Sequence, residues 1–375
     1  MRHLYVHVPF CPVICPYCDF HVLRRTKNSV NRYLDYLKKE ATLLYNKQPY
    51  FLNTLYIGGG TPSFLRDKEL ETLFSSLPWR YAHKPEITLE INPGTVTRGR
   101  LEFFRSLGVN RLSIGVQSFN DNLLRFLGRS HNAATAKRTV EEAMSLGFSV
   151  SIDLILALPE QDARAELKTA TALGVDHVSA YTLQIEPGTP FALRRLATSQ
   201  DNEASAFALA LEILGDAGLL RYEVSNYARP GSESRHNLAY WRMDSWGGLG
   251  PSAAAHFFSS GEKIISRRTT NPPLPRWLAG EPPETVELGP LDYVKESLMM
   301  GLRTRAGVDL ITLEKRSGLE LRRTLARAIS SLGEAGLIKL TGSLLTPSNA
   351  GLDRLHEVVL RLWEPLEASY SSDFS

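Results

Sequence analysis

Short apolar runs alternate with longer amphipathic segments through the first half of the chain. The apolar runs predict buried strands at residues 4–8, 54–58, 87–91, 111–116, 150–155 and 177–183. Apolar residues spaced three or four apart predict helices at residues 29–45, 67–77, 98–107, 133–146 and 163–173. Such β-then-α units are typical of a parallel sheet covered by helices, either doubly wound or curved as part of a barrel. In both folds, ligands bind at the carboxyl ends of the strands.

The second half of the chain has a different pattern. A helix is predicted at 201–217 and a strand at 221–225, and residues 271–290 are rich in proline. Three helical patterns then precede a short hairpin, an order that resembles a winged helix; they span 292–302, 310–317 and 319–335, with hairpin strands at 338–340 and 344–346. The arginines of the third helix, Arg322, Arg323 and Arg327, are more typical of a solvated face than of a DNA reader. A role in packing or partner contact is therefore expected.

These patterns divide the chain into four parts. Residues 1–185 are expected to form an α/β core, and residues 186–270 a segment that completes it. Residues 271–290 read as a linker or a surface wrap, and residues 291–375 as a winged-helix-like α+β module. The hydrophobic content of 43% is ample for a sizeable core.

Composition and sequence pattern limit the classes of binding partner and the cellular compartment that we expect. The net charge is only +3, so nothing in it requires nucleic acid or an acidic membrane surface, and we expect no nucleic-acid partner. No run of roughly 18 apolar residues is present, so no transmembrane segment is expected. The opening residues lack the apolar stretch of a signal peptide. With cysteines expected to stay reduced, these features predict a cytoplasmic protein.

The chain contains three cysteines, all in one run directly after the first predicted strand. Cys11, Cys15 and Cys18 have C-x3-C-x2-C spacing, which places three thiolates on one tight loop. Such a loop can hold three irons of a [4Fe–4S] cluster and leave the fourth iron open to a chelating ligand. A zinc site with His21 as fourth ligand is the alternative, although structural zinc sites usually use C-x2-C pairs. A disulfide framework would need an even number of cysteines.

Residues suited to ligand binding stand where the predicted strands end. The second strand ends in the run GGGTP, whose glycines let the backbone approach a ligand closely. Polar residues stand inside, at or after the ends of later strands, namely Glu90, Gln117, Arg129 and Asp153. Each alone is equally explained as a satisfied polar residue at a strand end, but together they favour a shared site. A carboxylate suits ribose hydroxyls, and an amide or guanidinium suits a ligand carboxylate.

The runs CPVICPYC, GGGTP, LEINP, NRLSIGVQSF, LGRSH and SIDLILALP, in this order, resemble the radical S-adenosylmethionine superfamily. Within it they resemble the branch of oxygen-independent coproporphyrinogen III oxidases and related haem chaperones, over roughly residues 3–260. The resemblance implies a partial (β/α)6 barrel of the TIM type with a [4Fe–4S] cluster on the three cysteines. Adenosylmethionine would bind the open iron and be cleaved reductively to methionine and a 5′-deoxyadenosyl radical. A flavodoxin or ferredoxin is the implied electron donor.

The resemblance also carries over individual site residues. The positions matching the adenosylmethionine contacts of the family are Tyr5, Tyr17, Gly59, Gly60, Thr61, Glu90, Gln117, Arg129, Asp153 and Ala254.

Two features separate the oxidase and chaperone branches. The oxidases carry a further cysteine two residues after the third cluster ligand, and here that position is Phe20, which can neither donate a hydrogen atom nor ligate iron. The run HNLAYW matches the HNxxYW motif associated with the chaperones. Haem as cargo, delivered to apo-haemoproteins, is the function that this branch implies. Coproporphyrinogen III oxidation is the first alternative, and radical chemistry on another substrate is the second.

The HNxxYW motif offers candidate haem contacts. His236 is a candidate iron ligand, Tyr240 and Trp241 can stack on a porphyrin, and Arg235 can pair with a propionate. The equal alternative is a core histidine with a packed aromatic pair. Ser234 stands where many relatives carry a cysteine, which removes one soft iron ligand and leaves the axial ligand open.

Overall fold

The computed structural model describes residues 1–194, 199–259 and 264–370. The predicted segments 186–270 and 291–375 therefore lie in part outside the described residues, at 195–198, 260–263 and 371–375. Among the helices that are described, none is both long and apolar enough to cross a membrane.

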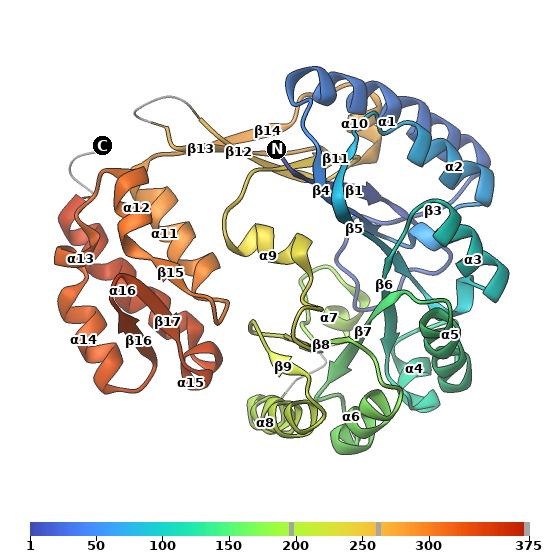
Figure 1. Ribbon diagram of the computed structural model, residues 1–375. Helices are drawn as coiled ribbons and strands as arrows, with labels where there is room; N and C mark the ends of the chain where they lie inside the picture. Colours follow the sequence, from blue (N-terminus) through green and yellow to red (C-terminus); the bar gives the residue numbers. More distant parts are fainter. Residues whose placement is uncertain (195–198, 260–263, 371–375) are drawn as a thin grey trace.

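A single curved sheet forms the centre of the larger lobe (Figure 1). Its strand order is β14-β13-β12-β11-β1-β4-β5-β6-β7-β8-β10-β9, so β14 and β9 are its two edges and the barrel is open. The parallel strands at its heart follow the chain in order: β1 (His3–Val8), β4 (Leu52–Gly59), β5 (Tyr81–Ile91), β6 (Arg111–Gln117), β7 (Ser149–Leu156) and β8 (His177–Thr182). The prediction of a partial barrel is confirmed. Its six predicted strands match these elements to within a few residues, apart from the long start of β5.

Helices cover the outer face of this sheet, as Figure 1 shows. They are α1 (Lys27–Lys47), α2 (Asp67–Ser75), α3 (Arg98–Ser106), α4 (Asp121–Phe126), α5 (Ala133–Ser145), α6 (Ala163–Ala172) and α8 (Gln200–Asp216). Several begin where a side-chain oxygen accepts a free backbone N–H of the first turn, as Thr26, Asn132 and Asp162 do. Their apolar faces pack on strand residues such as Leu55 and Ile152, which are fully buried.

Shorter elements extend the sheet at both edges. On one side are β11 (Trp246–Leu249), β12 (Ala254–Phe258), β13 (Ser266–Thr270) and β14 (Glu284–Leu288); on the other are β10 (Asn226–Ala228) and β9 (Leu220–Arg221). Around them lie β2 (Phe10–Cys11), β3 (Leu23–Arg24), α7 (Pro190–Leu193), α9 (Arg235–Trp241), α10 (Leu274–Leu278) and the 3-10 turns η1 (Pro62–Phe64) and η2 (Pro93–Thr95).

The Pro-rich segment is not a linker, contrary to that prediction. Its prolines flank α10, which buries Trp277 against Tyr33 and Tyr36 of α1. Its second half forms β14, which pairs with β13 and so belongs to the sheet. The predicted strand at 221–225 is also shorter than expected. It ends at Arg221, because the buried carboxylate of Glu223 turns the chain by accepting the backbone N–H of Ser225.

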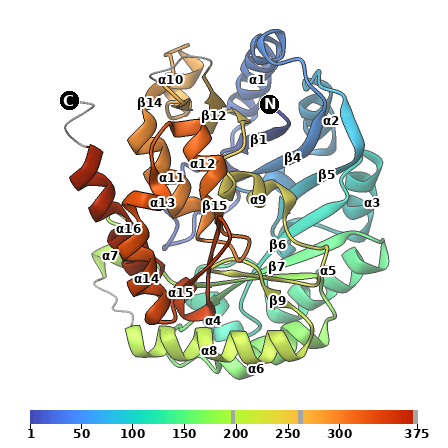
Figure 2. The ribbon, with the colours of Figure 1, turned by 60° about the vertical axis from the view of Figure 1, so that its left-hand side comes forward.

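The C-terminal module forms a second lobe beside the barrel (Figures 1 and 2). Its elements are α11 (Pro290–Gly301), β15 (Val308–Asp309), α12 (Leu310–Ser317), α13 (Leu321–Thr324), α14 (Ala326–Glu334), β16 (Ile338–Thr341), β17 (Leu344–Pro347), α15 (Asn349–Asp353) and α16 (Leu355–Tyr370). The hairpin and β15 form a small sheet in the order β15-β17-β16, next to the helices, as a winged helix requires. The helix predicted over 319–335 is divided at Leu325 into α13 and α14.

A buried ion pair joins the two lobes. Glu223 follows β9 and is fully buried, and Arg303 donates from Nε to its carboxylate at 2.9 Å. The guanidinium of Arg303 also stacks on the ring of Trp241 in α9, at 4.5 Å. A backbone bridge between Glu223 and Thr304 runs alongside. The C-terminal module is therefore fixed both to the end of the barrel sheet and to α9.

Candidate functional site

A cavity of about 510 Å³ opens at the carboxyl ends of the parallel strands and continues into the barrel. The loop of the three cysteines forms part of its lining, and so do side chains from β4 to β8. Of the predicted cofactor residues, the cavity brings together Cys11, Cys15, Cys18, Tyr17, Gly59, Gly60, Thr61, Glu90, Gln117, Arg129 and Asp153. The polar residues at the strand ends thus lie around one cavity.

The cysteine loop is short and firmly placed. Cys11 ends β2 and is buried, whereas Cys15 and Cys18 are half-buried on the loop that follows, closed by a Cys18 N–H to Cys15 C=O bond of 3.1 Å. The three thiols are free. Burial raises the pKa of Cys11 to about 11 and also raises that of Cys18. Such thiols need the positive charge of a metal to become thiolates, so the loop fits a metal group rather than a free nucleophile.

The three thiols are set apart from one another rather than gathered around one ion position. Among the residues described, no three His, Cys, Asp or Glu side chains converge on one ion position. Three thiols that bind separate corners of a cluster do not need to converge in this way. His21, the alternative fourth zinc ligand, is committed elsewhere, because its Nε2 accepts the backbone N–H of Leu274 at 3.0 Å.

The glycine-rich run lies directly against the cysteines. Gly59 has a φ of +110°, and its N–H donates to the Glu90 carboxylate at 2.9 Å. A side chain on Gly59 would lie 2.5 Å from the imidazole of His7, and one on Gly60 would lie 3.0 Å from the sulfur of Cys11. Thr61 donates its hydroxyl to the same sulfur at 3.4 Å. Only glycine therefore allows this backbone to pass so close to the cluster loop.

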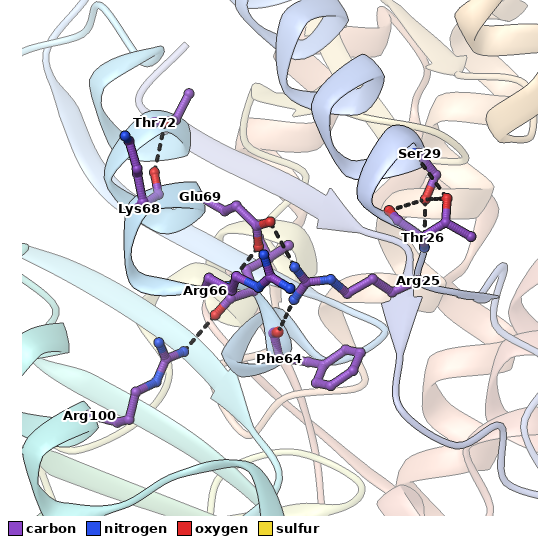
Figure 3. A network of polar contacts seen from close by, with 10 residues as sticks. Arg25, Thr26, Ser29, Phe64, Arg66, Lys68, Glu69, Thr72 and Arg100 are labelled. Atoms are coloured by element: carbon purple, nitrogen blue, oxygen red, sulfur yellow. Dashed lines mark hydrogen bonds and ion pairs between the residues drawn. The ribbon is translucent and has the colours of Figure 1, made fainter.

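A polar network braces the turn that follows the glycines (Figure 3). Arg25 forms an ion pair with Glu69 at 2.7 Å and donates to the carbonyl of Phe64 at 3.0 Å. Glu69 in turn accepts the backbone N–H of Arg66. Arg100 of α3 donates to the carbonyl of Leu65 at 2.6 Å. The turn after β4 is thus held from the segment just before α1, from α2 and from α3, which keeps the glycine run in a fixed position.

Two carboxylates line the cavity with raised pKa values. Glu90 accepts the hydroxyl of Tyr56 at 2.7 Å, and burial raises its pKa to about 7 despite that bond. Asp153 accepts the hydroxyl of Ser113 at 3.3 Å, and burial raises its pKa to about 6. Both side chains keep accepting capacity toward the cavity, as ribose hydroxyls require.

Arg129 places a buried cation between the cysteines and the strand ends. Its Nη1 lies 3.6 Å from the sulfur of Cys15, and its Nη2 donates to Asn92 and to the carbonyl of Gly115. Its Nε is buried and has no hydrogen-bond partner among the described residues. A guanidinium with an unmet donor beside the cluster loop fits the carboxylate of a ligand chelating the open iron.

Two predicted adenosylmethionine contacts do not line the cavity. Tyr5 lies behind it, where its hydroxyl is 3.0 Å from Nδ1 of His7 and its ring packs on Tyr56. Ala254 begins β12, where its carbonyl accepts the indole N–H of Trp246 at 3.1 Å and is tightly packed on Gly248.

The HNxxYW motif forms α9, and its histidine points away from the cavity. His236 is 1% exposed, with Nδ1 at 2.7 Å from the hydroxyl of Thr54 and Nε2 at 2.8 Å from that of Tyr240. Burial lowers its pKa to about 3, so the ring is neutral. Both ring nitrogens are occupied, and the alternative of a core histidine describes this structure better than an iron ligand.

The other predicted haem contacts also lie outside the cavity. Tyr240 packs on His236 and Trp246, and Trp241 stacks on Arg303 of the C-terminal module. Arg235 is exposed and donates to the carbonyl of Lys84.

Sequence reasoning missed several lining residues, namely Arg111, His177, Tyr181 and Asn237. For Arg111, the available signal was its place two residues before Ser113 on the same strand, which puts it on the same face of the sheet.

Comparisons with known proteins agree with this geometry. Residues 5–171 match the radical SAM superfamily, and residues 288–354 match the HemN C-terminal domain. The chain is 33% identical over 373 residues to the "Heme chaperone HemW" of Bacillus subtilis, with 94% of this chain and 96% of that protein covered. It is 38% identical over 282 residues to the HemW of Escherichia coli, with 72% and 74% covered.

A solved structure shares the whole fold. The coproporphyrinogen III oxidase HemN from Escherichia coli, a radical SAM enzyme, has a TM-score of 0.81 at 22% identity, covering 96% of this chain and 89% of that one. This likeness concerns the fold, whereas the Bacillus subtilis relative aligns in sequence over nearly the full length of both chains. On this basis the chain belongs to the HemW family of the radical SAM superfamily.

Proposed function

We propose that this protein is a cytoplasmic haem chaperone, which binds haem and transfers it to apo-haemoproteins. Relatives that align along nearly its whole length are named haem chaperones. The observation that carries the proposal is Phe20, which stands where the oxidases have a further cysteine. A phenyl ring offers no hydrogen atom or iron ligand, so chemistry that depends on that thiol is not available.

The position of Phe20 supports the same function. Phe20 is 62% exposed and lines the cavity, as do Val13 and Ile14 of the cysteine loop, which are 45% and 44% exposed. Large apolar side chains gathered at the mouth of a cavity are typical of a binding surface for an apolar ligand. A porphyrin face is such a ligand, and an aromatic ring stacks on it well.

The cofactors belong to the same proposal. Cys11, Cys15 and Cys18 would hold three irons of a [4Fe–4S] cluster, and Arg129 with the glycine run would position adenosylmethionine at the fourth. A reduced cluster supplies an electron for cleavage of that molecule, with a flavodoxin or ferredoxin as donor. The chain itself supplies orientation, through Glu90 and Asp153, and a cavity sheltered from bulk water.

Two assays on anaerobically reconstituted protein test the proposal. Titration with haem should shift the Soret band to saturation, and the loaded protein should then pass haem to an apo-globin acceptor. Incubation with coproporphyrinogen III, adenosylmethionine and a reductant should give no protoporphyrinogen.

Protoporphyrinogen formed at catalytic turnover would favour the oxidase alternative and refute the chaperone function. A haem titration without saturation, from a protein that holds its cluster, would favour radical chemistry on another substrate.

Phe20→Ala is the informative variant for the cavity mouth. We expect it to weaken haem binding while the iron content stays unchanged.

A further inference from the structure

The cavity has a polar floor that the predicted cofactor contacts do not use. Arg111 begins β6 and lies at this floor, with Ser234 and Asn237 of the segment that forms α9. Gly115, whose carbonyl binds Arg129, lies four residues further along β6, which is about 13 Å of strand. The cavity therefore contains two guanidinium groups at different depths.

Arg111 is a buried cation with no carboxylate in salt-bridge contact among the described residues, although its charge lowers the pKa of Asp153 against the larger effect of burial, which raises that pKa. The side chain of Arg111 is only 4% exposed, and it forms no ion pair with any residue that the structure describes. Its Nη1 donates to the hydroxyl of Ser149 at 3.3 Å and to the carbonyl of Ser232 at 3.0 Å. Within the described ranges, neither Nε nor Nη2 meets an acceptor. Nε and Nη2 together form one edge of the guanidinium, and such an edge can bind a carboxylate through two parallel hydrogen bonds.

The carboxylates of Glu86 and Asp153 already accept hydrogen bonds from the protein. Glu86 accepts the backbone N–H groups of Arg235 and His236 at 3.0 and 2.9 Å, which fixes the start of α9. Asp153 accepts the hydroxyl of Ser113. The amide of Asn237 faces the cavity without a side-chain partner among the described residues, so it offers a further donor beside Arg111. Because Arg111 and Asn237 both line the cavity, a carboxylate of a ligand can reach their free donors.

We infer that the floor of the cavity is a carboxylate-binding subsite, with Arg111 as its bidentate donor and Asn237 beside it. A carboxylate here would be separate from one held by Arg129 beside the cysteines. The group can come from a small organic acid or from a propionate arm of a porphyrin, and the two sources share this chemistry.

The probe for the subsite is sodium propionate, with propionamide as its neutral isostere at matched ionic strength. The melting temperature of the full-length wild-type protein should rise with propionate and stay unchanged with propionamide. Arg111→Met should abolish the rise, and Arg111→Lys, which keeps the charge and loses the fork, should weaken propionate binding roughly tenfold or more. Arg164→Met, which removes an exposed guanidinium on α6, should respond as the wild type does.

Equal effects of propionate and propionamide on the wild type would overturn the inference, as would a propionate response that persists in Arg111→Met. Haem and its dimethyl ester then distinguish the sources. If haem binds better than the ester and Arg111→Met removes that difference, the carboxylate is a porphyrin propionate. If the difference persists in the variant, the subsite takes a free acid. The test with sodium propionate uses no haem. The carboxylate subsite can therefore be confirmed even if haem binding, and with it the proposed function, fails.

Discussion

Replacing Arg303 by methionine should destabilise the protein through the carboxylate it leaves behind. Glu223 is fully buried, so losing its cation leaves a charge that water cannot reach. Breaking a buried pair costs about 3–5 kcal/mol. Arg303 itself is 30% exposed and Glu223 keeps the N–H of Ser225 as a donor, so we expect a smaller loss of about 2–3 kcal/mol. This includes the stacking of Arg303 on Trp241, worth roughly 0.5–1 kcal/mol.

Thermal unfolding followed by circular dichroism measures the effect. An unfolding entropy of about 2.1 cal/mol/K per residue converts this loss into a fall in Tm of about 3 °C for a chain of this length. The control is Arg164→Met, which breaks an exposed pair with Glu212 and should change stability by less than about 1 kcal/mol.

A double variant distinguishes the cost of leaving Glu223 charged and unpaired from the cost of losing the contacts of Arg303. Glu223→Gln combined with Arg303→Met removes both charges, so it should be less destabilised than the two single changes summed. If Arg303→Met melts with the wild type, or if the two changes are additive, the ion pair does not hold the lobes together in the way the structure indicates.

Four further predictions concern the cavity and its walls. Cys15→Ser should lose the broad iron–sulfur absorbance, and a variant that keeps four irons per chain would contradict the cluster assignment. Gly59→Ala should melt earlier and bind adenosylmethionine poorly, because its new Cβ meets an imidazole at 2.5 Å, whereas Gly99→Ala has open space and serves as its control. Since burial raises the pKa of Glu90 to about 7, its carboxylate becomes protonated as the pH falls below that value. Calorimetry should therefore show adenosylmethionine affinity falling from pH 8 to pH 6, and Glu90→Gln should flatten this dependence. His236→Ala should lower the Tm, while haem titration of the folded variant should still saturate; loss of haem binding without a change in Tm would restore the histidine as a direct ligand.

The barrel could be predicted from the sequence because buried parallel strands are continuous apolar runs. β1 and β6 carry such runs and lie within a residue or so of their predicted bounds. The later strands escaped prediction for a physical reason. β13 reads SRRTT and contains no apolar residue, and β14 reads ETVEL and is largely exposed at the edge of the sheet, so pairing with neighbours rather than an apolar buried run makes them strands.

Part of the site was equally predictable. Parallel strands deliver their carboxyl ends to one edge, so Glu90 and Asp153 had to meet there once the sheet was recognised. Arg111 gave only a weak signal, its alternation with Ser113 on the same strand, because a charged residue at the beginning of a strand is usually an exposed terminus. Its burial depends on the loop of residues 230–235, which closes the floor from 121 positions away through the carbonyl of Ser232. Contacts at that separation are not encoded in a local pattern.

The HNxxYW motif shows why residue type alone does not tell whether a side chain faces a ligand site. Residues one position apart on a helix differ by about 100° in direction, whereas residues four apart share a face. His236 and Tyr240 therefore point together into the core, where they bond to each other. Asn237 and Trp241 take the next face, with the amide toward the cavity and the indole toward Arg303 of the C-terminal module. This short helix therefore contacts the core, the cavity and the second lobe from different faces, and none of these contacts requires its histidine to touch a ligand.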